Sequence, residues 1–317
     1  MKELSQFAAD VLSGLSSSPR SLSSKYFYDD EGSRLFQEIM RLPEYYLTNC
    51  ETEIFTTRSD EIHDELVNGS SGFDIIELGA GDGTKTAILI ETFLRKNTDL
   101  TYSPIDISQE AVDTLSGKFK VRFPQLRVDS YVGDYFEILS SLSTAKGRRK
   151  VILFLGSNIG NFCRDRAIEF FRGLRGSMNA GDLLLVGFDL QKDPGTILRA
   201  YDDSAGITAR FNLNLLARIN RELDADFDPE KFSHYANYSP IDGSARSYLI
   251  SREKQSVEIR ALGRTFDFDQ WEAIFMEISQ KYSMKMIEDL AAEGGFGIKR
   301  NFFDSDLYFC DSLWQLR

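Results

Sequence analysis

Residues 73–85 read FDIIELGAGDGTK. The apolar run Phe73–Leu78 is typical of a strand that is buried on both faces of a parallel sheet, and helical spacing resumes over Thr86–Phe93. Between them lie three glycines, which reach backbone angles closed to other residues and let a ligand approach the main chain: Gly79, Gly81 and Gly83. This order of strand, glycine loop and helix predicts a cofactor loop.

The spacing of the glycines distinguishes two kinds of nucleotide loop. A dinucleotide-binding loop reads GxGxxG, whereas this loop reads GxGxG, with Glu77 before it and Lys85 after it. The pattern resembles the first motif of the class I S-adenosylmethionine-dependent methyltransferases. Glycine also occurs at strand-to-helix turns of other α/β proteins, so the loop by itself leaves the ligand open.

Polar residues follow three further predicted strands. The second strand ends in Asp106, where a carboxylate accepts hydrogen bonds from ribose hydroxyls in nucleotide-binding folds. Asp134 and Tyr135 follow the third; in methyltransferases an acid here faces the adenine amino group and its neighbour packs on the ring. The fourth strand leads to Asn161. Because open α/β sheets bind ligands at the carboxyl ends of their strands, this ordered set predicts a class I methyltransferase fold.

The alternation of strands and helices defines the fold class and the domains. From residue 73 to residue 189 it predicts an α/β protein with a doubly wound, Rossmann-like, mainly parallel sheet. Residues 232–269 alternate instead like antiparallel strands, which indicates a second, α+β domain. We expect a cofactor-binding domain from residues 61–195 and 286–317, and a substrate-binding domain from residues 1–60 and 196–285.

Composition narrows the class of substrate. The chain has 317 residues, 42% of them hydrophobic, which is enough for two cores. Its net charge of −12 argues against nucleic acid, because phosphate backbones are bound mainly through clustered Lys and Arg. We find neither a membrane-length apolar run nor a signal peptide. We therefore expect a monomeric, cytoplasmic protein that acts on a small molecule and has no membrane partner.

The cysteines and histidines do not suggest a metal site. Cys50, Cys163 and Cys310 are widely spaced without a CxxC pair, which is typical of reduced thiols. His63 and His234 stand apart from them and from each other. We therefore expect no metal ion.

Nine blocks, spread over nearly the whole chain, resemble one family of methyltransferases. They are KYFYDDEGSRLFQEI, RLPEYYLT, ELGAGDGTKT, PIDIS, GDY, FLGSNIGNF, RAYDD, FNLNLLARINREL and FMEISQKY. The family is the histidine-specific Nα-methyltransferases of ergothioneine biosynthesis, and LPEYY, GSNIGN and NLLARINREL are not general methyltransferase motifs. The resemblance implies trimethylation of the α-amino group of L-histidine to hercynine, with S-adenosylmethionine as the donor.

The same resemblance implies which residues form each site. The cofactor residues would be Gly79, Gly81, Lys85, Asp106, Asp134 and Tyr135. The substrate residues would be Tyr45, Asn161, Tyr201, Glu277 and Ser279. Tyr28 and Asn161 would orient the amine for methyl transfer and are the catalytic candidates.

The chemistry of these side chains suits a free amino acid. The amide of Asn161 can accept from an amino group and donate to a carboxylate, to which Tyr45 and Tyr201 would also donate. Glu277 and Ser279 lie two positions apart, so they share one face if this segment is extended. Each imidazole nitrogen would then have a partner.

Two alternative functions remain open at this stage. The first is Nα-methylation of tyrosine or tryptophan; Glu277 argues against it, because a carboxylate at the ring end suits an imidazole N–H. The second is a non-catalytic regulator with the same fold. The loop reads AGDGTK rather than the more usual SGTSEK, and Ser247 aligns where a larger apolar residue would line the imidazole pocket. Side-chain selectivity is therefore less secure than the fold.

Overall fold

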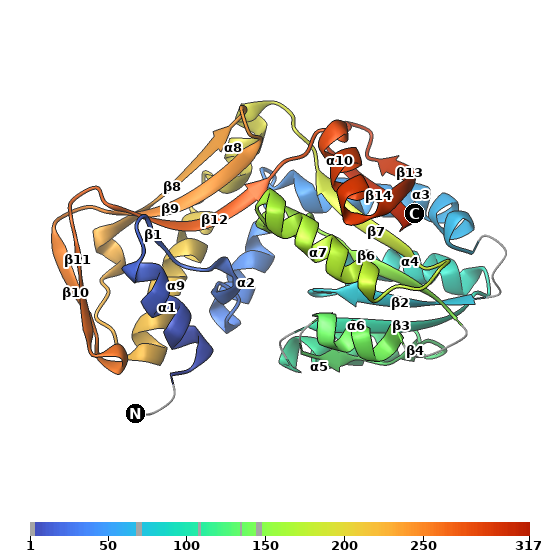
Figure 1. Ribbon diagram of the computed structural model, residues 1–317, viewed down its shortest axis with the longest axis horizontal. Coiled ribbons are helices and arrows are strands. Elements are labelled where there is room, and N and C mark those ends of the chain that lie inside the picture. Colours follow the sequence, from blue (N-terminus) through green and yellow to red (C-terminus); the bar gives the residue numbers. More distant parts are fainter. Residues whose placement is uncertain (1–3, 68–71, 107–108, 134, 144–147) are drawn as a thin grey trace. The chain divides into compact units, whose positions relative to one another are not determined.

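The chain folds as two compact units, each made from two segments of sequence (Figure 1). The structure is a computed structural model and describes residues 4–67, 72–106, 109–133, 135–143 and 148–317. Unit 1 comprises Met1–Tyr46 and Lys192–Ser279, and unit 2 comprises Leu47–Gln191 and Gln280–Arg317.

Unit 2 contains a mixed eight-stranded sheet with the order β13-β14-β7-β6-β2-β3-β4, and β5 also pairs with β3. The strands from β2 to β7 pair in parallel, whereas β14 is antiparallel to both β7 and β13. Their bounds are β2 Gly72–Leu78, β3 Asp99–Asp106, β4 Arg127–Val128, β5 Tyr131–Val132, β6 Arg149–Phe154, β7 Leu183–Asp189, β13 Phe296–Phe303 and β14 Phe309–Leu316. The predicted doubly wound, mainly parallel sheet is confirmed.

Helices cover both faces of this sheet. On one face α6, α7 and α10 pack against strand residues such as Ile76. On the other face Phe93 of α4 meets the ring of Phe73 edge-on, and Phe119 of α5 stacks on Tyr102. Successive residues of a strand point to opposite faces, which is why β2 is apolar almost throughout. The helices are α3 Tyr46–Val67, α4 Thr84–Arg95, α5 Gln109–Arg122, α6 Tyr135–Ser143, the 3-10 turn η2 Asn158–Asn161, α7 Arg164–Gly176 and α10 Met284–Gly294.

Unit 1 is an α+β structure built on a four-stranded sheet with the order β1-β12-β9-β8. The expected antiparallel strands are present, since β8 pairs with β9 and β10 pairs with β11 in antiparallel fashion. Its core joins Phe211 and Leu216 of α9 to Phe27 and Met276. The elements are α1 Gln6–Ser16, β1 Arg20–Ser21, η1 Ser24–Tyr26, α2 Asp30–Ile39, α8 Pro194–Tyr201, α9 Ile207–Leu223, η3 Pro229–Lys231, β8 Phe232–Ser239, β9 Ser244–Ser251, β10 Gln255–Ile259, η4 Arg260–Leu262, β11 Arg264–Phe268 and β12 Ala273–Gln280.

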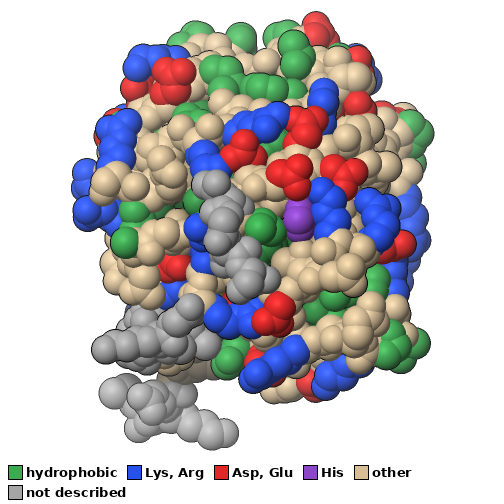
Figure 2. Space-filling view, turned by 90° about the vertical axis from the view of Figure 1, so that its right-hand side faces the viewer, with side chains coloured by type: hydrophobic (Ala, Val, Ile, Leu, Met, Phe, Trp, Pro, Cys, Tyr) green, Lys and Arg blue, Asp and Glu red, His purple; other side chains and the backbone are tan. Residues whose placement is uncertain are grey.

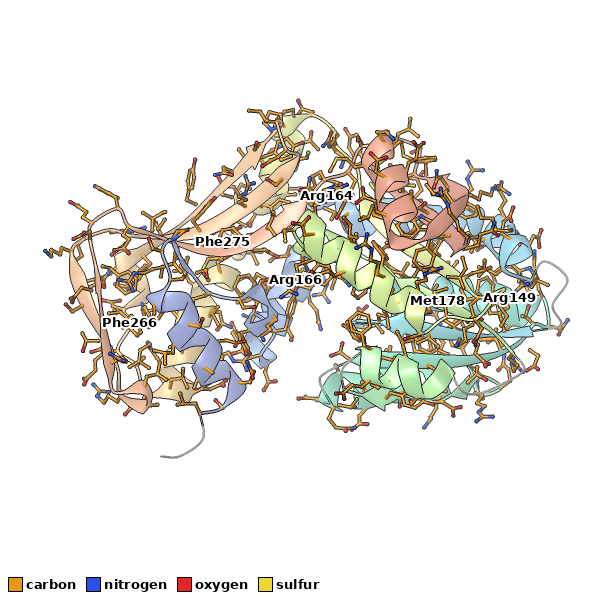
Figure 3. All side chains as sticks on the ribbon, viewed as in Figure 1. Arg149, Arg164, Arg166, Met178, Phe266 and Phe275 are labelled. Atoms are coloured by element: carbon orange, nitrogen blue, oxygen red, sulfur yellow. The ribbon has the colours of Figure 1, made fainter. Side chains whose placement is uncertain are left out.

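Charged side chains tie α3 to the rest of unit 2. Lys299 and Arg300 of β13 form ion pairs with Glu65 of α3. Figure 2 shows that acidic and basic side chains are interspersed on the face of the molecule that it draws. Arg149, which Figure 3 labels at the start of β6, donates to the carbonyl oxygen of Leu66 at 2.6 Å. Basic side chains commonly satisfy the last carbonyls of a helix in this way. The end of α3 is thereby fixed to the sheet.

The described residues contain neither a membrane-spanning helix nor a metal-binding cluster. None of the helices in these ranges is long and apolar enough to cross a membrane. The same ranges contain no group of three or more His, Cys, Asp or Glu side chains arranged to hold a metal ion. Cys50 and Cys310 are buried thiols, and Cys163 is an exposed one.

Candidate functional site

The glycine loop turns sharply between β2 and α4. Gly79, Gly81 and Gly83 all have left-handed backbones, with φ of +68°, +55° and +68°. Residues with a Cβ rarely adopt this conformation. At Gly83 space is lacking as well, because a Cβ there would lie 2.3 Å from the side chain of Leu115. The shape of the loop therefore depends on its glycines.

Three of the predicted cofactor residues lie around the start of this loop. A Cβ on Gly79 would approach the hydroxyl of Tyr135 to 3.1 Å and the side-chain amide of Asn158 to 3.5 Å. The Gly79 N–H donates to the carbonyl of Ile105 at 3.0 Å, and Asp106 follows at the end of β3. Asn158 was not predicted as a site residue, although it lies in the GSNIGN block that supported the family resemblance.

The segment after β3 is held against Asp106 by the main chain. Val132 of β5 pairs with Asp106, and the Gly133 N–H donates to the Asp106 carbonyl at 3.1 Å. Asp134, the next residue, lies outside the described residues. Its role as an adenine contact stays a prediction.

Lys85 lies in the first turn of α4 and forms an ion pair with Glu51 of α3. Glu51 is fully buried, and its other carboxyl oxygen accepts from the Gly156 N–H at 2.8 Å. Burial lowers the pKa of Lys85, but the attraction of Glu51 outweighs this effect and raises it above its ordinary value. Lys85 is therefore a stable ammonium group beside the glycine loop. No local pattern in the sequence indicated Glu51, because it contacts Lys85 only through the fold.

Glu77 joins the three elements that form the loop. It is buried at the end of β2, and its carboxylate accepts from the hydroxyls of Thr86 and Tyr102, each at 2.6 Å. Burial is the largest cause of the pKa of Glu77 rising to about 7, although these two hydrogen bonds act in the opposite direction. Both oxygens of Glu77 are engaged within the protein, so it supports the loop.

The short turn η2 carries Asn161 directly after β6. Ser157, before the turn, has a left-handed backbone with φ of 56°, and its hydroxyl accepts from the Asp189 N–H at 3.0 Å. The hydroxyl of Tyr282 donates to the carbonyl of Ile159 at 3.1 Å. A Cβ on Gly160 would lie only 2.9 Å from the main chain of Gln280, so glycine is needed there. These contacts fix the turn and leave Asn161 exposed at its end.

A second group of predicted residues lies in unit 1. The hydroxyl of Tyr201, at the end of α8, donates to the Oγ of Ser279 in β12 at 2.7 Å. Both residues are buried. Glu277 lies two positions before Ser279 in the same strand, and positions two apart share a face. This bond uses the phenolic proton that we had assigned to the substrate carboxylate.

Tyr28 and Tyr45 belong to an aromatic cluster in the same unit. The ring of Tyr28 lies edge-on to Phe36 and Phe211, with centroids 5.5 Å and 5.6 Å away. Phe36 in turn lies 6.2 Å from the ring of Tyr45. The surrounding protein, together with the charge of Glu277, raises the pKa of Tyr28, although 47% of its surface is exposed. The raised pKa favours the protonated hydroxyl of Tyr28, which can donate a hydrogen bond.

The predicted site residues thus form one group in each unit. Tyr28, Tyr45, Tyr201, Glu277 and Ser279 belong to unit 1, whereas Asn161 and the cofactor residues belong to unit 2. Ser247 is buried in β9 of unit 1, where it pairs with Ala236 of β8. Its predicted place in an imidazole pocket stays a prediction.

The fold and the loop of unit 2 define a class I S-adenosylmethionine-dependent methyltransferase: six strands in parallel pairing, an antiparallel β14 between β7 and β13, and a glycine loop after β2 beside the acid that ends β3. A sequence model described as histidine-specific, S-adenosylmethionine-dependent methyltransferase matches residues 7–316. The chain belongs to this family. It is therefore an enzyme, and S-adenosylmethionine is its cofactor.

Named relatives span most of the chain. The histidine N-alpha-methyltransferase of Mycobacterium tuberculosis is 37% identical over 286 residues, and that of Mycolicibacterium smegmatis is 38% identical over 286 residues; each alignment covers 90% of this chain and 87% of the relative. The ergothioneine biosynthesis protein 1 of Schizosaccharomyces pombe is 30% identical over 281 residues, which cover 87% of this chain and 36% of that protein.

Proposed function

We propose that this enzyme transfers three methyl groups from S-adenosylmethionine to the α-amino nitrogen of L-histidine and so forms hercynine for ergothioneine biosynthesis. Family membership and the names of the relatives support the proposal. The observation that carries it for this chain is the group in unit 1, where the Tyr201–Ser279 hydrogen bond lies beside Glu277. These are polar groups of the kind that an imidazole ring needs.

The residues of unit 2 fit S-adenosylmethionine. Gly79 and Gly81 leave the main chain uncovered, and a Cβ on Gly79 would reach into the space beside Tyr135. The ammonium of Lys85 would attract the carboxylate of the cofactor, and Asp106 would accept from its ribose hydroxyls. Asp134 would accept from the adenine amino group. When bound, the cofactor supplies a methyl group on a sulfonium, which is already an activated donor.

The residues of unit 1 would hold histidine by its two ends. Tyr45 would donate to the carboxylate, and Glu277 and Ser279 would each bind one imidazole nitrogen. Ser279 already accepts from Tyr201, and a serine hydroxyl that accepts one hydrogen bond still has a proton to donate. Asn161, a residue of unit 2, would bind the amino group. Tyr201 thereby orients Ser279. Tyr201 could donate to the substrate carboxylate only if its hydroxyl no longer donated to Ser279.

Methyl transfer requires a neutral amine in line with the methyl carbon. An α-amino group at a chain terminus has a pKa of about 7.7–8.0, so a proton must leave before transfer. Tyr28 is no base, because its pKa is raised and its hydroxyl stays protonated. We assign it, with Asn161, to orienting the amine lone pair, while water takes the proton. The Tyr28 ring also favours the growing ammonium through a cation–π interaction.

A methyltransferase assay tests the proposal directly. The purified protein is incubated with S-adenosylmethionine and histidine, tyrosine or tryptophan in separate reactions, and the products are detected by mass spectrometry. We expect trimethylated histidine and no product from the other two amino acids. Methylated tyrosine or tryptophan with unmodified histidine would favour the alternative substrates, and no product from any of them would contradict the proposed activity.

A further inference from the structure

Asp311 is a buried acid near the start of β14 that no part of the proposed mechanism explains. It pairs with Gly187 of β7 across the antiparallel ladder and has no exposed surface. Apart from the carboxyl group of Glu51, the described residues offer its oxygens no hydrogen-bond partner. A buried carboxylate without a donor is strongly disfavoured, because burial penalises the charged form.

Glu51 is the buried acid next to Asp311. It comes from α3, and its oxygens bind the Lys85 ammonium and the Gly156 N–H. Glu51 fits there because residue 187, which pairs with Asp311, is a glycine: a Cβ on Gly187 would lie 2.6 Å from a Glu51 oxygen. Burial and the negative charge of Glu51 raise the pKa of Asp311 well above its ordinary value. The two carboxyl groups therefore meet over the bare main chain of β7.

The charges around this pair leave one acid without a counterion. The titratable groups that act on Asp311 are Glu51 of α3, Lys85 of α4 and Asp304, which precedes β14. Burial and the charge of Asp311 raise the pKa of the Cys310 thiol, which lies on β14 itself. Lys85 also interacts with the carboxyl group of Glu77 in β2. A single ammonium neutralises a single carboxylate, and Glu51 is the acid in contact with Lys85. Asp311 therefore has no counterion, which favours its neutral, protonated form.

We propose that Asp311 is a positioning residue of the cofactor site: as a neutral carboxyl group it holds Glu51, and through Glu51 it fixes the Lys85 ammonium and the Gly156 amide. This inference rests on the proposed role of Lys85 in binding the carboxylate of S-adenosylmethionine. A protonated carboxyl group can donate its proton to Glu51 without competing for Lys85. An ionised one would repel Glu51 and attract Lys85 away from the cofactor.

The test compares two substitutions of Asp311 in the full chain. The affinity for S-adenosylhomocysteine, without histidine, is measured by calorimetry for D311A, D311N and the wild type. We expect D311A to weaken binding about tenfold, and D311N, whose amide is neutral and retains a donor, to restore it to within about threefold of the wild type. E51Q, which loses the charge that holds Lys85, should weaken binding about tenfold or more. D306A, an exposed acid just before the same strand, is the matched control.

Several outcomes would overturn the proposal. Wild-type affinity in D311A would show that Asp311 positions nothing, and equal loss in D311N and D311A would show that a neutral donor is not sufficient. If D311A does not fold, as judged by its melting curve, the infrared difference spectrum between the wild type and D311N decides the matter. We expect the band of a protonated carboxyl group in the wild type; a carboxylate band at neutral pH would contradict the proposal.

The readout also separates this inference from the proposed function. Binding of S-adenosylhomocysteine does not involve the amino acid substrate, so the comparison stands even if histidine is not methylated. Conversely, trimethylation of histidine by a D311A variant with wild-type cofactor affinity would leave the proposed function intact and remove the role of Asp311.

Discussion

The hydroxyl of Tyr201 donates a 2.7 Å hydrogen bond to the Oγ of Ser279, across 78 residues of sequence. The bond is buried and joins the end of α8 to β12, two positions from Glu277. A hydrogen bond of this kind contributes about 1 kcal/mol to stability, and it also fixes the direction of both side chains. Tyr201 therefore belongs to the imidazole end of the proposed histidine pocket as much as to the carboxylate end.

Replacing Tyr201 by phenylalanine should weaken histidine binding. The substitution leaves the Ser279 hydroxyl without its orienting donor, so we expect KM for histidine to rise about tenfold with a smaller change in kcat. Steady-state kinetics and calorimetry with S-adenosylhomocysteine measure the two ligands separately. Tyr235→Phe on β8, where the side chain is exposed, is the control. A loss of cofactor affinity with unchanged KM would place Tyr201 elsewhere.

Replacing Glu277 by glutamine should reduce the preference for histidine. Hydrogen bonds to a charged group contribute roughly 1.5–3 kcal/mol, so kcat/KM for histidine should fall about ten- to a hundredfold. Competition assays with tyrosine and tryptophan show whether discrimination narrows. Glu230→Gln, an exposed acid of unit 1, should behave like the wild type. An unchanged kcat/KM in Glu277→Gln would sink the assignment of this carboxylate to the imidazole ring.

Replacing Tyr28 by phenylalanine tests orientation against base catalysis. The pKa of Tyr28 is raised, so its hydroxyl does not ionise in the range where the substrate amine titrates. We expect Tyr28→Phe to lower kcat while the pH at which activity rises stays the same. Single-turnover measurements over the three transfers would show whether one step is affected most. A shift of the pH profile would mean that the hydroxyl itself titrates, and three unchanged steps would remove its role.

Glu77 should make the protein less stable as the pH rises from about 4.5 to about 7. Its pKa is raised to about 7 from 4.5, so in this window the unfolded chain releases a proton that the folded protein retains. The contribution of Glu77 to the free energy of unfolding is fully present below pH 4.5 and is lost as the pH rises to about 7, a difference of roughly 3 kcal/mol. Melting temperatures of Glu77→Gln and the wild type across this range measure the effect. The glutamine variant should lack this part of the pH dependence, whereas Glu110→Gln, at an exposed position of α5, should keep it.

Two glycines of the cofactor loop offer a matched pair of alanine substitutions. Both have positive φ, so each alanine introduces strain of about 1–2 kcal/mol. A Cβ on Gly83 also meets Leu115 and Phe119, whereas a Cβ on Gly81 has nothing within 4 Å. Gly83→Ala should therefore lower the melting temperature more than Gly81→Ala, and equal effects would contradict this account. Affinity for S-adenosylhomocysteine shows how far each change disturbs the loop.

Much of unit 2 could be predicted from the sequence because its signals are local. The apolar run of β2, the glycine loop and the acid at the end of β3 are continuous in sequence, and the fold places them as expected. The alternation of residues 232–269 likewise predicted antiparallel strands, which are present in unit 1. These features depend on periodicity and on turn chemistry, both of which a single sequence records.

The supporting contacts could not be predicted, because they join distant segments. Glu51 contacts Lys85 from α3, a helix whose sequence does not mark that position as buried. Asp311 reads as one acid within an apolar stretch, and only the pairing with Gly187 shows what it faces. The predicted boundary at residue 60 falls inside α3, since this helix runs without a break from Tyr46 to Val67. The role of each domain and of Asp134 stays a prediction.

The two-segment construction of unit 2 has a consequence for synthesis on the ribosome. Strand β14 lies between β7 and β13, so the sheet cannot be completed until residues 309–316 have been made. By then all of Lys192–Ser279, and with it unit 1, has already been synthesised. The nascent chain therefore has the material of one unit complete while the other still exposes the open edge of β7. Unpaired strand edges are prone to aggregation, so we expect this edge to need protection until β14 has paired with it.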